Sequence, residues 1–312
     1  MKQLHQGLKI HKSGQLSLIQ DFGRYGFSHL GLTQGGPIDE YAYSWANHLL
    51  ANPINCATIE ITLGQADFEV LKPCTLSIAG GELGVTLDGI KVKNWSTFNA
   101  QKGQILKFGF AKNGLRSYLA VVGGFNVKQQ HGSCATVMRD RLGGQNEDGK
   151  PITHGDVISF STHRQQLKPN SLTFRFTPDY NLPLKLRVIE SYQHSQFSSD
   201  AMTAFYQQTF SVSQHINRMG YRLTDGKITP PAGDILSEGI ALGAIQVPPN
   251  GEPIILLNDR QTIGGYPKIG CVARIDLPRL AQAKPEQAVQ FVKGDLKGLQ
   301  DVWCQWARFF GY

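Results

Sequence analysis

Residues 258–267 read NDRQTIGGYP and stand between two stretches that favour β structure. The apolar run at 253–257 predicts a short buried strand before them, and the run at 271–276 predicts a second strand after them. A turn between two strands is a rigid place from which polar side chains reach a ligand, and paired glycines leave backbone N–H groups accessible. The alternative interpretation is a hairpin whose polar tip is simply solvated.

Length and composition bound the fold class. The chain has 312 residues, of which 41% are hydrophobic and 18% are charged, so it is globular and long enough for two domains. Its 34 glycines and 15 prolines predict many turns and few long helices. Strand-like runs recur about every ten residues between 57 and 160, which is typical of an antiparallel barrel or sandwich.

The polar, proline-containing segment 161–181 is the best candidate for a domain boundary. We therefore predict an N-terminal β-rich domain at 1–180 and a C-terminal β-barrel domain at 181–312. Helical spacing of apolar residues predicts a few short helices. We expect them at 38–49, 199–206, 277–283 and, as the C-terminal helix, 299–309.

Charge and cysteine usage exclude several classes of protein. The net charge is +7, but lysines and arginines are scattered, so we expect an anionic substrate or acidic partner and no nucleic acid. The five cysteines are widely spaced and contain no Cys-x-x-Cys, which predicts reduced thiols. No apolar run approaches the ~18 residues that span a bilayer, and the polar N-terminus lacks a signal-type core. We expect a cytoplasmic protein with no membrane contact.

Two motifs that suggest other chemistry are weak. Residues 144–150 (GQNEDGK) have the spacing of a phosphate-binding P-loop, but Pro151 replaces the residue that coordinates magnesium, and no strand–helix context surrounds them. His131 and Cys134 lack a second pair of metal ligands. No Gly-x-Ser-x-Gly motif points to a serine hydrolase.

Three clusters combine arginine, carboxylate or amide groups with glycine and an aromatic residue. They are Asp21 with Arg24, Arg218 with Arg222, and Asp259 with Gln261 and Thr262. Arginine binds carboxylates and phosphates through paired hydrogen bonds, and carboxylates such as Asp39 hold magnesium or act as bases. The alternative interpretation is that each pair is a structural salt bridge that fixes a loop.

Glu60, Arg116 and Tyr118 lie in strand-like runs of the first predicted domain. Glu60 stands between Ile59 and Ile61, so its side chain points to the opposite face of the strand. That face is either a lined pocket or solvent, and we favour the pocket.

A series of short motifs occurs in order along the chain. They are DFGRYG (21–26), GPID (36–39), AN (46–47), EIT (60–62), RMGYRL (218–223), SEG (237–239), GAIQVP (243–248) and DRQTIGGYP (259–267). Together they resemble the biotin-dependent carboxyltransferase / allophanate-hydrolase subunit 2 family, from about residue 16 to about residue 291.

The resemblance implies a mainly β chain of two cyclophilin-like β-barrel units, in agreement with the strand spacing. Within the family, the free-standing chains of this length that it resembles are C subunits of 5-oxoprolinase. That resemblance implies that the C subunit works with the B subunit, ATP and Mg²⁺ to phosphorylate the lactam of 5-oxoproline. The A subunit then completes ring opening to L-glutamate.

The same resemblance suggests roles for the candidate residues. We expect Asp259, Gln261 and Thr262 to orient the reacting groups, with Arg218 as the fourth catalytic candidate. Metal ligands are not assigned. The candidates for binding substrate or phosphate are Asp21, Arg24, Asp39, Asn47, Glu60, Arg116, Tyr118, Arg222, Gly264, Gly265 and Tyr266.

The chain departs from the family pattern at Ile263, where a second Thr is usual, and at Asn217, where an acid or Ser often precedes the Arg. It also lacks a Met-Lys-Met biotin-attachment motif, so biotin would have to arrive on another protein. Two other functions stay open. One is regulatory binding that antagonises a histidine-kinase inhibitor, a protein that is itself similar to the B subunit. The other is carboxyl transfer from carboxybiotin, as in urea amidolyase. We expect the chain to be inactive alone.

Overall fold

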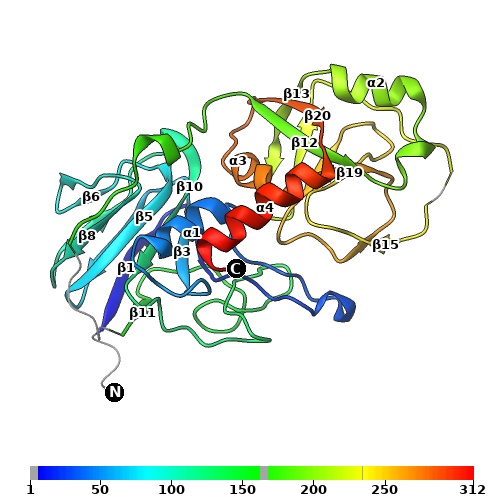
Figure 1. Cartoon of the computed structure of the whole chain (residues 1–312). Helices are drawn as coiled ribbons and strands as arrows, with labels where there is room; N and C mark the ends of the chain where they lie inside the picture. The colour runs from blue at the N-terminus through cyan, green and yellow to red at the C-terminus, as the bar shows by residue number, and fades with distance from the viewer. Residues whose placement is uncertain (1–5, 162–167, 234) are drawn as a thin grey trace. The chain divides into compact units, whose positions relative to one another are not determined.

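The computed structural model of the chain describes residues 6–161, 168–233 and 235–312 (Figure 1). The chain forms two compact units, of which the first comprises Met1–Tyr25 and Gly35–Tyr180 and the second comprises Gly26–Gln34 and Asn181–Tyr312. The predicted boundary segment 161–181 lies partly outside the described residues, at 162–167. The described residues are mainly β with few helices, which confirms the predicted fold class at that level.

The first unit contains two antiparallel sheets. The six-stranded sheet has the order β11-β1-β4-β9-β6-β7, and the five-stranded sheet has the order β2-β3-β10-β5-β8. The strands are β1 (Gly7–Ser13), β2 (Leu16–Gln20), β3 (Thr58–Thr62), β4 (Ala66–Val70), β5 (Cys74–Glu82), β6 (Thr86–Leu87), β7 (Ile90–Lys91), β8 (Ser96–Ala100), β9 (Ile105–Lys107), β10 (Asn113–Val121) and β11 (Val157–Ser159).

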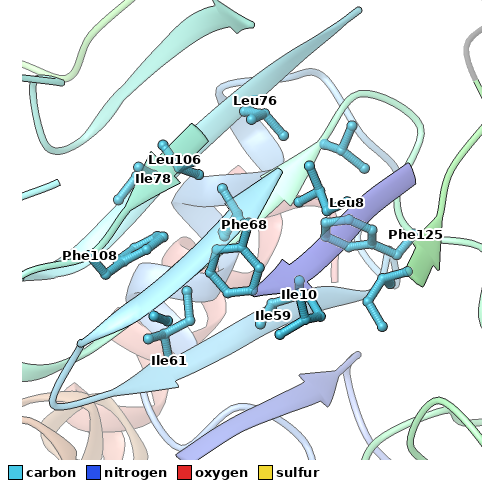
Figure 2. Packing of buried hydrophobic residues seen from close by; sticks show 14 of the residues in the cluster. Leu8, Ile10, Ile59, Ile61, Phe68, Leu76, Ile78, Leu106, Phe108 and Phe125 are labelled. Atoms are coloured by element: carbon cyan, nitrogen blue, oxygen red, sulfur yellow. The ribbon is translucent and has the colours of Figure 1, made fainter. Parts of the chain in front are cut away.

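The core of this unit consists of apolar side chains that both sheets contribute. Figure 2 shows Leu8, Ile10 and Phe68 from the six-stranded sheet packed near Ile59 and Ile61 of β3. These residues are fully buried, and they alternate along their strands with residues that face the other way. The alternation in β3 therefore places Glu60 on the opposite face of the five-stranded sheet.

That opposite face is covered by helix α1 (Glu40–His48), which lies against β5 and β10. The helix begins where Asp39 accepts a hydrogen bond from Ala42 N at 2.9 Å, as an N-cap residue does. Ser77 Oγ donates to Ala46 O at 2.5 Å and fixes the helix to β5. Gly80 permits this close approach, since a Cβ atom there would lie 3.3 Å from the Ala42 Cβ and 2.5 Å from Arg116 O. A short 3₁₀ turn, Phe174–Phe176, lies near the end of the unit.

The second unit is built on a closed barrel with the strand order β12-β19-β16-β17-β14-β13-β20. Its strands are antiparallel neighbours except for β12 and β20, whose parallel pairing closes the barrel. They are β12 (Leu184–Glu190), β13 (Phe210–Ile216), β14 (Gly220–Thr224), β16 (Ala244–Gln246), β17 (Ile254–Leu256), β19 (Lys268–Val272) and β20 (Ala288–Lys293). A separate two-stranded ribbon pairs β15 (Glu238–Gly239) with β18 (Ile263–Gly264).

The prediction of a strand over 271–276 is wrong in its extent. Strand β19 begins earlier, at Lys268, and ends at Val272, and Arg274–Asp276 forms a 3₁₀ turn that leads into α3 (Leu277–Ala281). The turn is fixed by Asp276, whose carboxylate accepts hydrogen bonds from Arg187 N at 2.8 Å and Nε at 2.9 Å. A helix start therefore replaces the second half of the expected strand.

Two longer helices complete this unit. Helix α2 (Ser199–Gln207) packs against β20, with Phe205 stacked on Phe291 at 4.4 Å between ring centroids. Helix α4 (Leu296–Phe310) begins at the cap residue Asp295 and contacts the 3₁₀ turn through Arg274, which lies 4.0 Å from the centroid of the Trp303 ring. Short 3₁₀ turns occur at Ser28–Leu30 and His194–Gln196. No helix among the described residues is long and apolar enough to cross a membrane.

Candidate functional site

Arg218 and Asp259 form a buried ion pair at one end of the barrel. The guanidinium donates from Nε to Asp259 Oδ2 and from Nη2 to Oδ1, each at 2.9 Å, and the side chains are only 4% and 5% exposed. Strand pairing explains the meeting, because Gly220 of β14 lies opposite Leu256 of β17. Just beyond the ladder, Asp259 N donates to Arg218 O. The structure thus brings two of the predicted catalytic residues together.

Arg222 lies on strand β14, four positions after Arg218, which precedes the strand. Its Nη1 lies 3.6 Å from Glu252 Oε2, in a half-exposed ion pair. The two arginines of the RMGYRL motif therefore do not converge on one ligand oxygen.

The glycine pair of the opening stretch lies on the ribbon and beside a group of amide side chains. Gly264 pairs with Glu238 of β15. A Cβ atom at Gly264 would lie 3.1 Å from Gln246 Nε2 and 3.5 Å from Gln261 Nε2. The next residue, Gly265, is similarly enclosed, because a Cβ atom there would lie 3.0 Å from Ile235 O. Any other residue at these two positions would press against its neighbours, so glycine is required for this close packing.

The remaining residues of the stretch lie at the surface of the ribbon. Thr262 is half-buried, and its carbonyl oxygen accepts a hydrogen bond from Ile240 N at 3.0 Å. Tyr266 is 46% exposed, and Ile263, at a position that departs from the family pattern, is 62% exposed. Gln261 and Thr262 therefore follow the Arg218–Asp259 pair by two and three residues but lie closer to the surface.

Lys268 is a functional candidate that the sequence did not single out. It is only 5% exposed, and its Nζ lies 2.5 Å from Glu238 Oε1. Glu238 also accepts hydrogen bonds from Gln193 Nε2 at 2.8 Å and from the Tyr192 hydroxyl. The Lys268 ammonium, and then the Tyr192 hydroxyl, lower the pKa of Glu238. A lysine directly after the GGYP sequence was a signal that sequence reasoning passed over.

In the first unit, three candidates form a buried hydrogen-bonded network. Tyr118 donates its hydroxyl hydrogen to Glu60 Oε2 at 2.7 Å, and Asp39 N donates to the Tyr118 hydroxyl at 2.9 Å. Tyr180 donates to Asp39 Oδ2 at 3.1 Å. Burial, followed by the charges of Glu60 and Asp39, raises the pKa of Tyr118 well above its usual value. Glu60 therefore faces a polar interior and not solvent.

The network reaches an open cavity through Tyr180. The cavity has a volume of 960 Å³, which is at the upper end of the size range of small-molecule sites. Its wall includes two lysines, Lys91 and Lys93, and the rings of Trp95 and Phe174. Two asparagines of the wall are also fixed by hydrogen bonds. Asn94 Nδ2 donates to Gly80 O, and Asn113 Oδ1 accepts from Tyr180 N.

Asp21 and Arg24 both contact the segment around residues 130–135, but through different atoms. Asp21 accepts hydrogen bonds from Ser133 Oγ at 2.5 Å and Cys134 N at 2.7 Å. Arg24, which is 1% exposed, donates to the carbonyl oxygens of Gln130, Ser133 and Ala135. Burial, and then the charge of Asp21, raises the pKa of Cys134 well above its usual value.

The last two candidates of the first unit are Asn47 and Arg116. Asn47, near the end of α1, donates to Cys56 O at 3.1 Å and accepts from Asn52 Nδ2 at 2.9 Å. Arg116 lies on β10 opposite Thr62 and is 4% exposed. No group of three His, Cys, Asp or Glu side chains that could hold a metal ion occurs in the described part of the chain.

Comparison with known proteins places the chain in a family. Residues 30–293 match the model of the carboxyltransferase domain, subdomain A and B, so the chain belongs to this family. It is 34% identical over 292 residues to the 5-oxoprolinase C subunit of Escherichia coli (strain K12), covering 93% of this chain and 92% of the relative. It is 32% identical to the 5-oxoprolinase C subunit of Haemophilus influenzae, covering 88% and 86%. Urea amidolyase of Saccharomyces cerevisiae is 26% identical over 95% of this chain, which spans only 17% of that protein.

Solved structures show the same fold. The crystal structure of TTHA0988 has a TM-score of 0.84 and 29% identity over 92% of this chain, which spans 56% of the length of that protein. The Kluyveromyces lactis urea carboxylase has a TM-score of 0.87 at 22% identity, over 97% of this chain and 29% of that one. The second likeness concerns the fold alone.

Proposed function

We propose that this chain is the C subunit of an ATP-dependent 5-oxoprolinase and works with the B and A subunits of that enzyme. The observation that carries the proposal is the length-matched similarity to two 5-oxoprolinase C subunits, 34% and 32% identical, each over most of both chains. The urea amidolyase relatives, in contrast, are several times longer than the region matched. We also infer that both units have cyclophilin-like topology, and the closed barrel of the second supports this.

The proposed reaction activates a poor electrophile. A lactam carbonyl resists attack by water, and transfer of a phosphoryl group from ATP to the lactam oxygen creates a good leaving group. Positive charge and N–H donors stabilise such a transfer. In this chain the group available is the Arg218 guanidinium, held in one orientation by Asp259.

Three candidate carboxylates among the described residues do not fit a preformed Mg²⁺ site. Asp39, Glu60 and Asp259 each already accept hydrogen bonds from protein groups. Mg²⁺ is usually held by one or two carboxylates together with substrate phosphates. We therefore propose that the B subunit helps to bind ATP and its Mg²⁺, and that the contacts of Arg24 favour a positioning role for that residue. Biotin has no part in this proposal.

Carboxyl transfer is the second candidate function, because the family model that matches is a carboxyltransferase domain. Under this proposal the chain would accept the carboxyl group from carboxybiotin carried on another protein. Dependence of turnover on a biotinylated protein separates this function from the first.

The test is reconstitution. The purified chain is mixed with its candidate A and B subunits, ATP and Mg²⁺, and glutamate release is followed with and without 5-oxoproline. We expect glutamate only when all components are present, and none from the chain alone. Stable complex formation without ATP-dependent glutamate release would contradict the 5-oxoprolinase proposal. The same assay with Arg218→Ala tests the ion pair, provided that partner binding is retained.

A further inference from the structure

Gln246 and Lys268 are neighbours in the barrel wall. They are paired residues of the neighbouring strands β16 and β19, and such side chains lie on the same face of a sheet, about 5 Å apart at their Cβ atoms. Both are buried, at 2% and 5% exposure. A cation and an amide thus stand side by side with little access to water.

Both side chains have donor capacity that the described protein groups do not use. Gln246 Nε2 is buried and has no hydrogen-bond partner among the described residues. Lys268 Nζ contacts Glu238 Oε1 as an ion pair but without the alignment of a hydrogen bond. Buried donors are normally satisfied, and one that is not requires an explanation, such as a ligand.

Gly264 packs tightly beside the buried amide of Gln246. A Cβ atom at Gly264 would come within 2.6 Å of Ile240 Cδ1 and 3.1 Å of Gln246 Nε2. Gly264 and Gln261 are half-buried and Tyr266 is exposed, so this side of the ribbon reaches solvent. Only a glycine fits here without displacing Ile240, and it lets the ribbon lie directly against the buried amide.

Glu238 shows which chemistry the site accepts. Its carboxylate is held by Lys268, by Gln193 Nε2 and by the Tyr192 hydroxyl. It stands on β15, which is paired with β18 over only two residues. Because Glu238 stands on a short ribbon, the carboxylate of a ligand can take the place of the Glu238 carboxylate beside Lys268.

We propose that Lys268 and Gln246, beside Gly264, bind the carboxylate of a small-molecule ligand, and that Glu238 occupies Lys268 when this ligand is absent. The identity of the ligand rests on the proposed function, since 5-oxoproline carries one carboxylate. The carboxylate site itself rests on the buried donors and on the contacts of the Glu238 carboxylate described above. Lys268 and Gln246 bind and position the ligand, and they carry out no chemical step.

The experiment measures 5-oxoproline binding to the full chain, alone and with the candidate B subunit, by titration calorimetry. The probe without a carboxylate is 2-pyrrolidinone, which has the same lactam ring. We expect Lys268→Met to weaken binding by about tenfold or more, as loss of a charge-assisted hydrogen bond does. We expect Glu238→Gln to tighten binding, by roughly threefold or more, because the competing charge is removed while the side chain keeps its size.

The matched controls come from a second Lys–Glu pair on the barrel. Lys293 Nζ lies 2.8 Å from Glu190 Oε2, and this lysine is 70% exposed. Lys293→Met and Glu190→Gln make the same chemical changes and should leave binding unchanged. The gain expected for Glu238→Gln is decisive, because a folding defect does not tighten binding.

The inference is overturned if Glu238→Gln fails to tighten binding, if Lys268→Met binds as tightly as the wild type, or if 2-pyrrolidinone binds equally well. It is also overturned if neither the wild type nor Glu238→Gln binds 5-oxoproline. Its failure and that of the proposed function are separable. Glutamate release with an unchanged KM in Lys268→Met would support the function and reject the site. The predicted binding pattern without glutamate release would support the site and reject the proposed function.

Discussion

Tyr118 donates its hydroxyl hydrogen to Glu60 at 2.7 Å while both side chains are fully buried on adjacent strands of the five-stranded sheet. The same hydroxyl accepts a hydrogen bond from Asp39 N, directly before helix α1. One phenol therefore connects the sheet to the start of the helix that covers it. A buried carboxylate in this position needs its donors, because an unsatisfied buried group costs free energy.

Tyr118→Phe should lower the free energy of unfolding by about 1–3 kcal/mol, because it leaves Glu60 short of one donor and Asp39 N without that acceptor. The test is urea unfolding, in which the midpoint of Tyr118→Phe is compared with that of the wild type. Tyr25→Phe is the matched control, since Tyr25 is 46% exposed and a phenylalanine keeps its ring stacked on Phe22. Equal midpoints for the two variants would contradict the role assigned to the Tyr118 hydroxyl.

Breaking the Arg218–Asp259 pair should destabilise the protein strongly. Removal of one partner leaves the other charge buried, at a cost of about 3–5 kcal/mol in either Arg218→Ala or Asp259→Ala. The double variant should be less destabilised than the sum of the two, as measured by a double-mutant cycle. The half-exposed pair of Arg222, on β14, and Glu252 serves as the comparison, where we expect a coupling of about 0–1 kcal/mol. Additive effects at Arg218 and Asp259 would show that the pair is not coupled.

The cysteines should differ in reactivity. Burial raises the pKa of Cys74 to about 12 and also raises that of Cys134, so neither forms the reactive thiolate at neutral pH in the folded protein. Cys304, on α4, is exposed. With a thiol-specific reagent at pH 8 we expect a fast phase that disappears in Cys304→Ser, and reaction of Cys74 and Cys134 only after unfolding. Fast modification of Cys134 in the native state would contradict this order.

The sequence predicted the helices and strands whose apolar residues recur at regular spacing. It missed strands in which polar residues outnumber the apolar ones. Strand-like runs were expected from residue 57 onward, and the structure has β3 at Thr58–Thr62. Strand β1, at Gly7–Ser13, was not expected, because Lys9 and His11 make the segment look polar although Leu8 and Ile10 are fully buried. A strand with only two buried apolar side chains gives a weak local signal.

The partners of the candidate residues depend on contacts between distant parts of the chain. Asp259 was a candidate because of its neighbours in sequence, but its bond to Arg218 follows from the pairing of β14 with β17. The position of Lys268 beside Gln246 likewise follows from strand register, which the pattern of single strands does not specify. Residue types were therefore predictable and their pairs were not.

Gly143 and Gly132 provide a test of how tightly the Arg24 region is packed. Both have positive φ, 66° and 76°, so alanine at either position costs about 1–2 kcal/mol in backbone strain. A Cβ atom at Gly143 would also lie 2.0 Å from Ala135 O and 2.6 Å from Arg24 Nη2, whereas nothing lies within 4 Å of one at Gly132. Gly143→Ala should therefore destabilise the chain by about 1–3 kcal/mol more than Gly132→Ala in urea unfolding, because the overpacked site must shift backbone atoms. If the two variants unfold at the same urea concentration, the segment that Arg24 holds yields easily, and a rigid positioning role for Arg24 would have to be abandoned.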